Sequence, residues 1–385
     1  MHIERGDAVA LTRALVAVDS RNPSLVAGGP GENDVAKLLA DVLRDWGCAV
    51  ELHEVIPGRS NVVARIGRGG GRSLMFNGHL DVVDVAGMTH APFEPAERDG
   101  RIYGRGASDM KAGVAAMCAA AVRAYDRGLA GEVIITAVID EEFASIGTRA
   151  VIDRGIRADA AIVTEPTRLA IMPAHRGFVW VDLHVVGRAA HGSRWDIGID
   201  AIRHTGLFLA ELDRYDATTL AAKNHPLLGR PSVHASVISG GSGRSTYPDR
   251  CDLQIERRTI PGETPAQIFS EIEELADRVR LSRPEFDARI SVVVSQEPSD
   301  VETSAPIVRA LSSALATCNL PESIEGMSAW TDAALLNGAG IPAICFGPGD
   351  IALAHAAEEF VRRQEIEDAT SVLTELAVRW TAERG

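Results

Sequence analysis

Histidine and acidic residues follow several apolar, strand-like runs of this chain, in the segments NGHLD, ASDMK, VIDEEF, VTEPT and ALAH. The seven residues are His79, Asp81, Asp109, Glu141, Glu142, Glu165 and His355. Carboxylates that lie close together repel one another, and each raises the pKa of its neighbours. A pair of divalent cations would remove this penalty. Two imidazoles with three or four carboxylates suit zinc, with cobalt or manganese as substitutes, so the pattern predicts a hydrolase with two metal ions.

The pair His79 and Asp81 is more informative than either residue alone. A single histidine at this position would be interpreted as a hydrogen-bonded turn residue. Residues two apart on an extended segment point to the same side, so the Asp81 carboxylate could accept from the imidazole and fix its tautomer. The other ring nitrogen of His79 would then be free to bind metal.

The acidic residues further along the chain each have an ordinary alternative role. Asp109 could cap the helix expected from Ala112, or it could aim its carboxylate into a cleft and bridge two ions. Glu141 and Glu142 could be a surface pair. They directly follow the apolar run VIITAVI, however, and a buried strand seldom ends in three acids without a ligand. One glutamate could bind metal while its neighbour takes a proton from the attacking water.

The elements that must position these residues alternate between helix and strand in the first part of the chain. Helices are expected at 7–18, 32–46, 112–127 and 146–154, and strands at 50–56, 61–66, 73–77, 132–139 and 160–163. This alternation predicts a doubly covered, largely parallel sheet. In such sheets, sites form beyond the carboxyl ends of the strands. The candidate ligands follow three of these strands, which favours one shared site.

The pattern changes near residue 177. Strands are expected at 178–187, 232–241, 251–259 and 288–294, with helices at 199–215 and 264–281, in the β-α-β-β-α-β order of a ferredoxin-like unit. The α/β pattern resumes with helices at 305–318, 330–338 and 364–382 and a strand at 341–347. We predict an α/β catalytic domain of residues 1–176 and 297–385, with a mainly parallel central sheet. Residues 177–296 are predicted to form an inserted α+β domain.

Composition restricts the class of protein. A length of 385 residues exceeds the roughly 250–300 at which one core stops growing, so two domains are expected. The net charge of −14 argues against a nucleic-acid partner and an anionic membrane surface. The sequence contains no apolar window of membrane-spanning length and no signal-peptide pattern at MHIERGDAVA. Five scattered cysteines without CxxC spacing favour a reducing compartment, so we expect a cytoplasmic protein.

The motifs HLD, ASDMKAG, DEE, TEPT and GPG…AH…EE resemble, in this order and over nearly the whole chain, those of the M20 metallopeptidases. That family includes acetylornithine deacetylases, succinyl-diaminopimelate desuccinylases and carboxypeptidases. The resemblance implies Asp109 as a bridging ligand, His79 and Glu165 on one ion, and Glu142 and His355 on the other. It also implies Glu141 as the general base. Glutamate at position 165 is more similar to the deacylase and carboxypeptidase branches than to the aminopeptidase branch.

The inserted domain resembles the lid and dimerisation domain of the same family. The resemblance implies that His191, in AAHGS, reaches a partner subunit's active site and helps to hold the scissile carbonyl oxygen; an exposed loop histidine is the alternative. It implies that Arg258, in ERRTIPG, binds a substrate carboxylate, for which its planar fork is suited. A surface arginine on an edge strand is the alternative there. Ser245 departs from the family, which often has asparagine near this substrate-contacting position, and Asp200 replaces an asparagine in GIDAI.

The expected activity is hydrolysis of an N-acyl or peptide-like amide bond in a small carboxylate-bearing substrate. The stretch TEPT…PAHRG is most similar to the acetylornithine deacetylase branch. Carboxypeptidase, dipeptidase and desuccinylase activities of the same family are alternatives. A catalytically silent binding protein would have lost a ligand or the base, and none is missing. The alternating strand FVWVDLHVV is expected to be exposed and to need covering, which favours a homodimer through the inserted domain.

Overall fold

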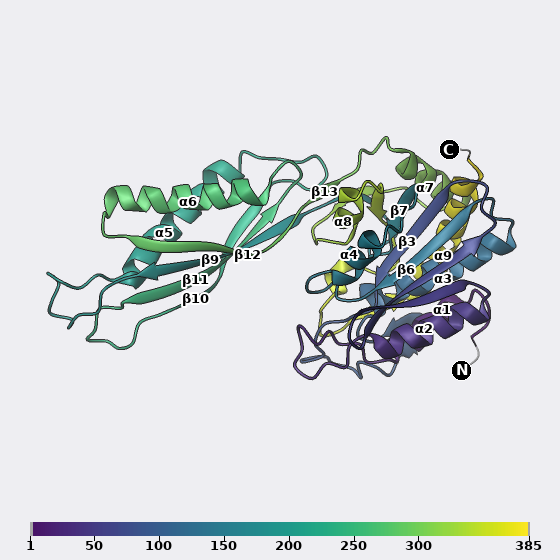
Figure 1. The fold of residues 1–385 in the computed structure, drawn as a ribbon, viewed down its shortest axis with the longest axis horizontal. Coiled ribbons are helices and arrows are strands. Elements are labelled where there is room, and N and C mark those ends of the chain that lie inside the picture. The colour runs from purple at the N-terminus through teal and green to yellow at the C-terminus, as the bar shows by residue number, and fades with distance from the viewer. Residues whose placement is uncertain (1–2, 384–385) are drawn as a thin grey trace. The chain divides into compact units, whose positions relative to one another are not determined.

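A computed structural model describes residues 3–383, which fold as two units (Figure 1). Unit 1 contains the described residues up to 173, residues 301–325 and the chain from 331 onward. Unit 2 contains residues 174–300 and 326–330. The chain therefore leaves unit 1 after residue 173, builds most of unit 2, returns at residue 301, and adds residues 326–330 to unit 2 before it ends in unit 1.

The sheet of unit 1 has parallel strands at its centre. In spatial order its strands are β1 (Ala49–Ile56), β2 (Arg59–Gly67), β6 (Glu132–Val138), β3 (Ser73–His79), β7 (Ala160–Val163), β15 (Ala343–Cys345) and β8 (Ile171–His175). The four strands from β6 to β15 run parallel, which confirms the expected parallel core. Strands β1, β2 and β8 pair antiparallel at the flanks. The sequence did not indicate β8, nor the short β13 (Ser299–Asp300) and β14 (Ile324–Met327) that pair with it.

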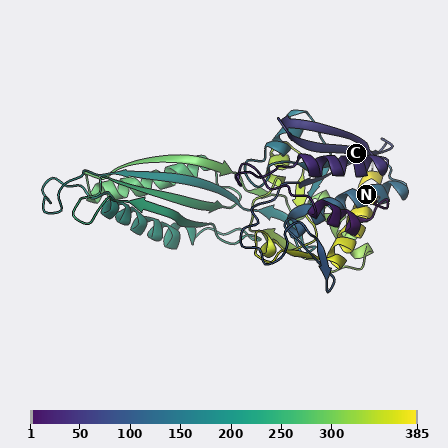
Figure 2. The same cartoon turned by 90° about the horizontal axis from the view of Figure 1, so that it is seen from below.

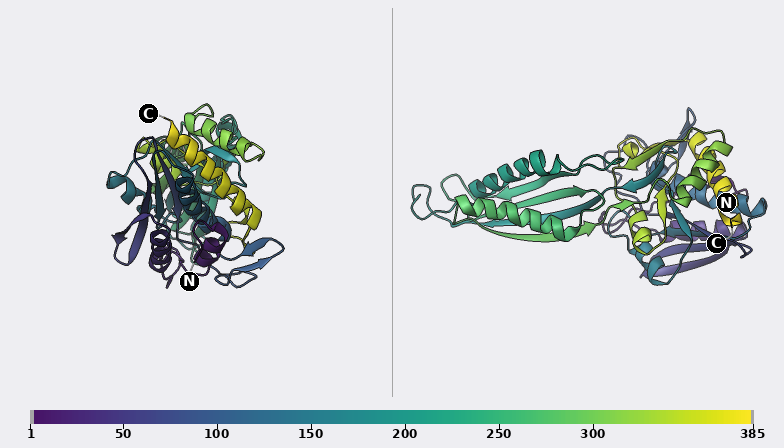
Figure 3. Two further views of the ribbon diagram at one scale, coloured as in Figure 1. Left: turned by 90° about the vertical axis from the view of Figure 1, so that its right-hand side faces the viewer. Right: turned by 90° about the horizontal axis from the view of Figure 1, so that it is seen from above.

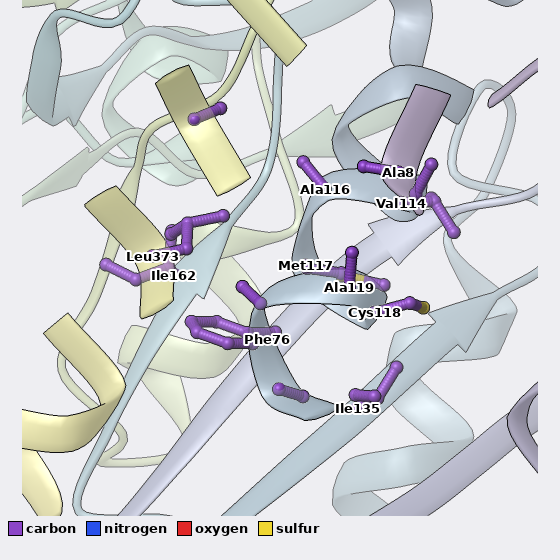
Figure 4. Packing of buried hydrophobic residues seen from close by; sticks show 14 of the residues in the cluster. Ala8, Phe76, Val114, Ala116, Met117, Cys118, Ala119, Ile135, Ile162 and Leu373 are labelled. Atoms are coloured by element: carbon purple, nitrogen blue, oxygen red, sulfur yellow. The ribbon is translucent and has the colours of Figure 1, made fainter. Parts of the chain in front are cut away.

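Helices cover this sheet and fill the core of unit 1. They are α1 (Ala8–Val16), α2 (Asn33–Asp45), α3 (Ala112–Asp126), α4 (Ile146–Asp153), α7 (Pro306–Thr317), α8 (Ala333–Gly338) and α9 (Arg363–Ala382). Helix α3 is rich in alanine and almost entirely buried, and small side chains let it pack closely against both α1 and α9. Figure 4 shows Met117 of α3, Phe76 of β3 and Leu373 of α9 in the same buried cluster. The long helix α9 is the yellow helix in the left view of Figure 3.

Three very short strands form a separate small sheet in unit 1. They are β4 (Ala96–Arg98), β5 (Arg101–Tyr103) and β16 (Phe360–Arg362), in the order β16-β5-β4. The irregular turn η1 (Ala107–Lys111) follows β5, and the 3₁₀ turn η3 (Ile351–Leu353) precedes β16. This sheet joins the segment before Asp109 to the segment after His355.

Unit 2 is a four-stranded antiparallel sheet with helices on one face (Figures 2 and 3). Its main elements are β9 (Gly177–Val186), α5 (Ala201–Tyr215), β10 (Ser232–Gly240), β11 (Arg250–Thr259), α6 (Pro265–Ser282) and β12 (Asp287–Gln296), with the turn η2 (Asp216–Leu220) after α5. The strand order is β10-β11-β9-β12, the order of a ferredoxin-like split β-α-β-β-α-β unit. Alternate residues of β9, such as Val181, pack against Phe208 and Ile272 of the helices.

The expectation that FVWVDLHVV is an exposed strand in need of covering was wrong. This strand is β9, which pairs with β11 on one side and β12 on the other. Its alternation arises because one sheet face packs on α5 and α6 while the other face is open, a pattern that does not distinguish a central strand from an edge strand. The edges of the sheet are β10 and β12.

Within residues 3–383, no helix is long and apolar enough to cross a lipid bilayer.

Candidate dinuclear metal centre

Three neighbouring parallel strands of unit 1 end at the candidate site. His79 is the last residue of β3, Glu141 and Glu142 follow β6, and Glu165 lies two residues beyond β7. Because β3 pairs in parallel with both β6 and β7, the carboxyl ends of the three strands lie side by side. The structure therefore brings these candidate residues to one edge of the sheet.

Asp109 reaches the site from the irregular turn η1. It does not cap α3: the capping position is Lys111, and no side chain there bonds the first helical amides. Gly113 explains how the start of α3 lies so close to the site, because a Cβ at this residue would sit 1.9 Å from the carbonyl oxygen of Thr164. The glycine of the ASDMKAG segment therefore lets Asp109 lie beside Glu165.

The Asp109 carboxylate faces one histidine with each of its oxygens. Its Oδ1 lies 3.1 Å from His79 Nε2, and its Oδ2 lies 3.6 Å from His355 Nε2. His355 Nε2 also lies 3.1 Å from Glu142 Oε2. A carboxylate with one oxygen directed at each of two histidines has the geometry of a bridging ligand.

The potential ligand atoms form two overlapping groups. Those of His79, Glu141 and Glu165 lie within 4.8 Å of one another, and so do those of His79, Asp109 and Glu142. All six histidine and acidic residues assigned above to metal binding or proton transfer are therefore brought together. The side chains of Glu141 and Glu142 are only 10% and 9% exposed, so they are not an ordinary surface pair.

The two histidines of the site have raised pKa values. Burial alone would lower the pKa of His79, but its hydrogen bond to Asp109 and the nearby charges of Glu141 and Asp81 outweigh burial and raise it well above the ordinary value. The hydrogen bond from His355 to Glu142 raises the pKa of His355 to about 9. Both imidazoles therefore attract positive charge, which a metal ion would supply in place of a proton.

The carboxylates of the site repel one another. Burial, followed by the charges of neighbouring carboxylates, raises the pKa of Glu165 and Glu141 well above the ordinary value, although His79 opposes this. Burial and the charge of Asp109 likewise raise the pKa of Glu142. Asp109 differs, because its hydrogen bond to His79 overcomes burial and lowers its pKa. Buried carboxylates held together against repulsion, with two imidazoles among them, fit a pair of divalent cations.

The role expected for the Asp81 carboxylate is not the one that the structure shows. His79 Nδ1 lies 2.9 Å from the backbone carbonyl oxygen of Asp81, whereas the nearest carboxylate oxygen of Asp81 is 3.6 Å away. A carbonyl oxygen can only accept, so Nδ1 carries the proton and Nε2 is left for metal. The Asp81 carboxylate instead accepts from the backbone N–H groups of Glu141 and Glu142, each at 3.2 Å. Side-chain direction along the strand could not reveal this, because β3 ends at His79 and Asp81 lies beyond it.

A buried polar network supports Asp81, and the sequence did not indicate it. Asn22 donates to Asp81 at 2.8 Å and to Asp140 at 3.0 Å. Arg59 in turn donates to Asp140 at 3.0 Å and forms an ion pair with Glu32. These residues come from separate segments of the chain. The polar segment SRNPS and the three consecutive acids at 140–142 are the sequence features that could have suggested them.

Asp332 is a second residue that sequence reasoning missed. Its Oδ2 accepts from Thr148 at 2.6 Å, whereas its buried Oδ1 has no hydrogen-bond partner within the described part of the chain. Burial raises the pKa of Asp332 to about 6, and its charge contributes to the raised pKa of Glu141. Nothing in the surrounding sequence, SAWTDAAL, distinguishes it from a helix-start residue.

The remaining candidate residues belong to unit 2. His191 is exposed, with Nδ1 2.8 Å from Ser193 Oγ, and the backbone oxygen of Ser245 accepts from Gly192 at 2.7 Å. His191 and Ser245 therefore lie on two loop segments that pair with each other. Arg258 lies on β11, where it pairs with Glu256 at 2.8 Å and stacks over Phe178.

Asp200 caps helix α5, with its carboxylate accepting from Arg203 N–H at 2.9 Å. Asparagine could fill the same capping position.

Comparison with known proteins gives consistent matches. A model of peptidase family M20/M25/M40 matches residues 75–379. An acetylornithine deacetylase of Myxococcus xanthus is 33% identical over 316 residues, covering 81% of this chain and 81% of that protein. An N-formyl-4-amino-5-aminomethyl-2-methylpyrimidine deformylase of Bacillus subtilis (strain 168) is 28% identical over 411 residues, covering 98% and 95%. The crystal structure of an aminopeptidase of Bacillus cereus ATCC 10987 has the same fold, with a TM-score of 0.81 at 18% identity and coverage of 99% and 100%.

Proposed function

This chain belongs to peptidase family M20/M25/M40, and we propose that it is a dinuclear amidohydrolase that removes the acyl group from an N-acyl amino acid, as an acetylornithine deacetylase does. The observation that supports this most directly is the convergence of two histidines and four carboxylates on one edge of the unit 1 sheet. We propose zinc as the metal, with cobalt or manganese as functional substitutes. A cytoplasmic location is part of the proposal, since all five cysteines are free thiols.

The residues divide into ligands and a base. Asp109 would bridge two ions, with His79 and Glu165 on one side and Glu142 and His355 on the other. Glu141 remains for proton transfer: it lies three residues beyond β6, and the hydrogen bond from its own backbone N–H to Asp81 fixes its position. Its raised pKa favours a group that can hold a proton during turnover.

The chemistry follows from this arrangement. When bound, the two ions would supply Lewis acidity, which lowers the pKa of a water molecule and polarises the scissile carbonyl. Glu141 would accept the proton of the attacking water and return it to the nitrogen of the leaving amine. Arg258 would orient the substrate through its carboxylate, and Ser245, on the loop segment that pairs with that of His191, would also contact the substrate. His191 would donate to the developing oxyanion.

The substrate class is tested by a panel of amides. We expect zinc- or cobalt-loaded protein to hydrolyse N-acetylornithine with a higher kcat/KM than N-succinyl amino acids, dipeptides or N-formyl aminopyrimidines. Protein carrying Glu141→Gln, purified in the same way, controls for contaminating hydrolases. A higher kcat/KM for dipeptides or succinyl substrates would show that the protein has another activity of the family in place of deacetylation. If the loaded protein hydrolyses none of the panel, the amidohydrolase proposal loses its support.

We also propose that unit 2 serves as a lid and pairs two copies of the chain through β10. This edge strand, SVHASVISG, carries no Asp, Glu, Lys or Arg, and Val237 and Ile238 are each 53% exposed. The opposite edge, β12, contains Asp287 and Arg289, and charged side chains protect an edge strand against pairing. An uncharged edge with exposed apolar side chains favours a two-fold symmetric partner.

Light scattering should therefore show a homodimer, and Val237→Lys should shift it toward monomer. Val293→Lys is a matched control on β12, where the valine is similarly exposed, at 54%. It should leave the dimer intact. The monomeric variant should also lose activity, because the proposed His191 contact comes from the other copy. A monomeric wild-type protein with full activity would contradict the role proposed for His191.

A further inference from the structure

Glu359 is a fully buried acidic residue that the proposed reaction does not use. It is 0% exposed and stands at the end of the GPG…AH…EE segment, four residues after His355 and immediately before β16. Burying a charged carboxylate is costly unless it is well paired. The contacts of Glu359 show what it is paired with.

The two oxygens of Glu359 have different partners. Oε1 accepts from the backbone N–H of Ser108 at 2.9 Å and from that of Asp109 at 3.1 Å. Oε2 accepts from Arg105 Nη1 at 2.7 Å. Arg105 is itself buried and is anchored by a bond from its Nε to the backbone oxygen of Asp84 at 3.0 Å. Each of these partners donates a hydrogen bond. The side chain at position 359 must therefore accept at both of its oxygens, as an ionised carboxylate does.

The turn that carries Asp109 depends on these bonds. Within η1, Asp109 and Met110 have non-helical backbone angles, so the N–H groups at its start do not enter the regular helical ladder. Buried N–H groups need another acceptor. Glu359 supplies it for Ser108 and Asp109. Since the N–H of Asp109 is fixed, so is the point from which its carboxylate extends.

Glu359 also joins this turn to the segment that carries His355. Its backbone oxygen accepts from Gly104 N–H at 3.2 Å, and β16 pairs with β5. Ser108 Oγ bonds the backbone of Asp350 in the same returning segment, at 3.1 and 3.0 Å. The positions of Asp109 and His355 are thus coupled through one buried carboxylate, as Asp81 couples the backbone positions of Glu141 and Glu142.

We propose that Glu359, held by Arg105, is a positioning residue that fixes the bridging Asp109 relative to His355 and so sets the metal affinity of the site. This inference rests on the proposed dinuclear centre. Residues behind the ligands of a metal site typically change metal affinity or activity by about 10–100-fold when altered. A neutral amide at 359 would turn its NH₂ toward either Arg105 or the two backbone donors. The turn would then shift.

The test is a zinc titration of metal-free protein in competition with a chromophoric chelator. Glu359→Gln should weaken zinc binding by roughly 10–100-fold. Glu358→Gln is the matched control: it removes the same charge at the adjacent, exposed position and should bind zinc as the wild type does. Glu359→Asp keeps the charge for Arg105 but withdraws the carboxylate from the turn, so it should also weaken binding. If Glu359→Gln does not fold, Glu359→Asp is the variant to be measured.

The outcomes separate two failures. A wild-type protein that binds no zinc would overturn the proposed metal centre itself. A wild type that binds two ions, with Glu359→Gln and Glu359→Asp equally tight, would leave the centre standing and overturn the role of Glu359. A lower melting temperature of the metal-free variants with unchanged zinc affinity of the folded protein would assign Glu359 a structural role only, and would likewise overturn the proposal.

Discussion

Replacing Glu141 by Gln should lower kcat by about 10²–10⁴-fold, the usual contribution of general-base catalysis, while both metal ions stay bound. The amide has the same shape as the carboxylate but cannot accept the proton of the attacking water. The backbone bond from residue 141 to Asp81 does not depend on the side chain, so the loop should keep its position. Steady-state kinetics together with elemental analysis of the purified variant measure both quantities.

Glu142→Gln provides the comparison, because it removes one negative charge at the adjacent residue. Glu142 lies against His355 and belongs to the group with Asp109, so this variant should lose affinity for one ion. Added metal should partly restore its rate, whereas it should not restore that of Glu141→Gln. Two variants with the same defect would indicate a general electrostatic role. A near-normal kcat for Glu141→Gln would require another base.

Asp109→Asn should abolish activity and weaken both ions together. Each oxygen of the Asp109 carboxylate faces a different histidine, so a neutral side chain there would remove a ligand from each ion. The loss of affinity should exceed the roughly 10–100-fold typical of residues behind the ligands, because a direct ligand is affected. Isothermal titration of the metal-free variant with zinc measures this.

Glu165→Gln is the control for the bridging role. Glu165 groups with His79 and Glu141, whereas Asp109 lies against both His79 and His355. Glu165→Gln should therefore weaken one ion and leave the second close to its wild-type affinity. If Asp109→Asn also retained one ion at full affinity, Asp109 would be a terminal ligand, and the two-ion arrangement would need another bridge.

The sequence allowed the central sheet, and the meeting of the candidate residues at its edge, to be predicted because both depend on local patterns. Apolar runs of strand length ended in His79, in Glu141 and Glu142, and just before Glu165, and parallel strands bring such ends together. The order of helices and strands likewise indicated two different sheets. These inferences need only the chain's periodicity and the rule that connects it to topology.

The parts that could not be predicted depend on contacts between distant segments. The bonds of Asp81 to the backbone of Glu141 and Glu142 join segments about 60 residues apart, which no local spacing encodes. Glu359 meets Asp109 across 250 positions of sequence. The sequence did not show that β9 is a central strand. Alternating apolar and polar residues indicate that one face of a strand is exposed to solvent, but not how many strands pair with it. Strands as short as β5 and β16 form because they pair with each other, and three residues are too few to show an alternating sequence pattern.

The central claim is that one edge of the unit 1 sheet binds two divalent ions through these side chains. Crystals of zinc-loaded protein, with diffraction data recorded on either side of the zinc absorption edge, test it most directly. We expect two anomalous peaks, with Asp109 between them, His79 and Glu165 at one, and Glu142 and His355 at the other. A single peak, or peaks away from these residues in a protein that hydrolyses its substrate, would contradict it.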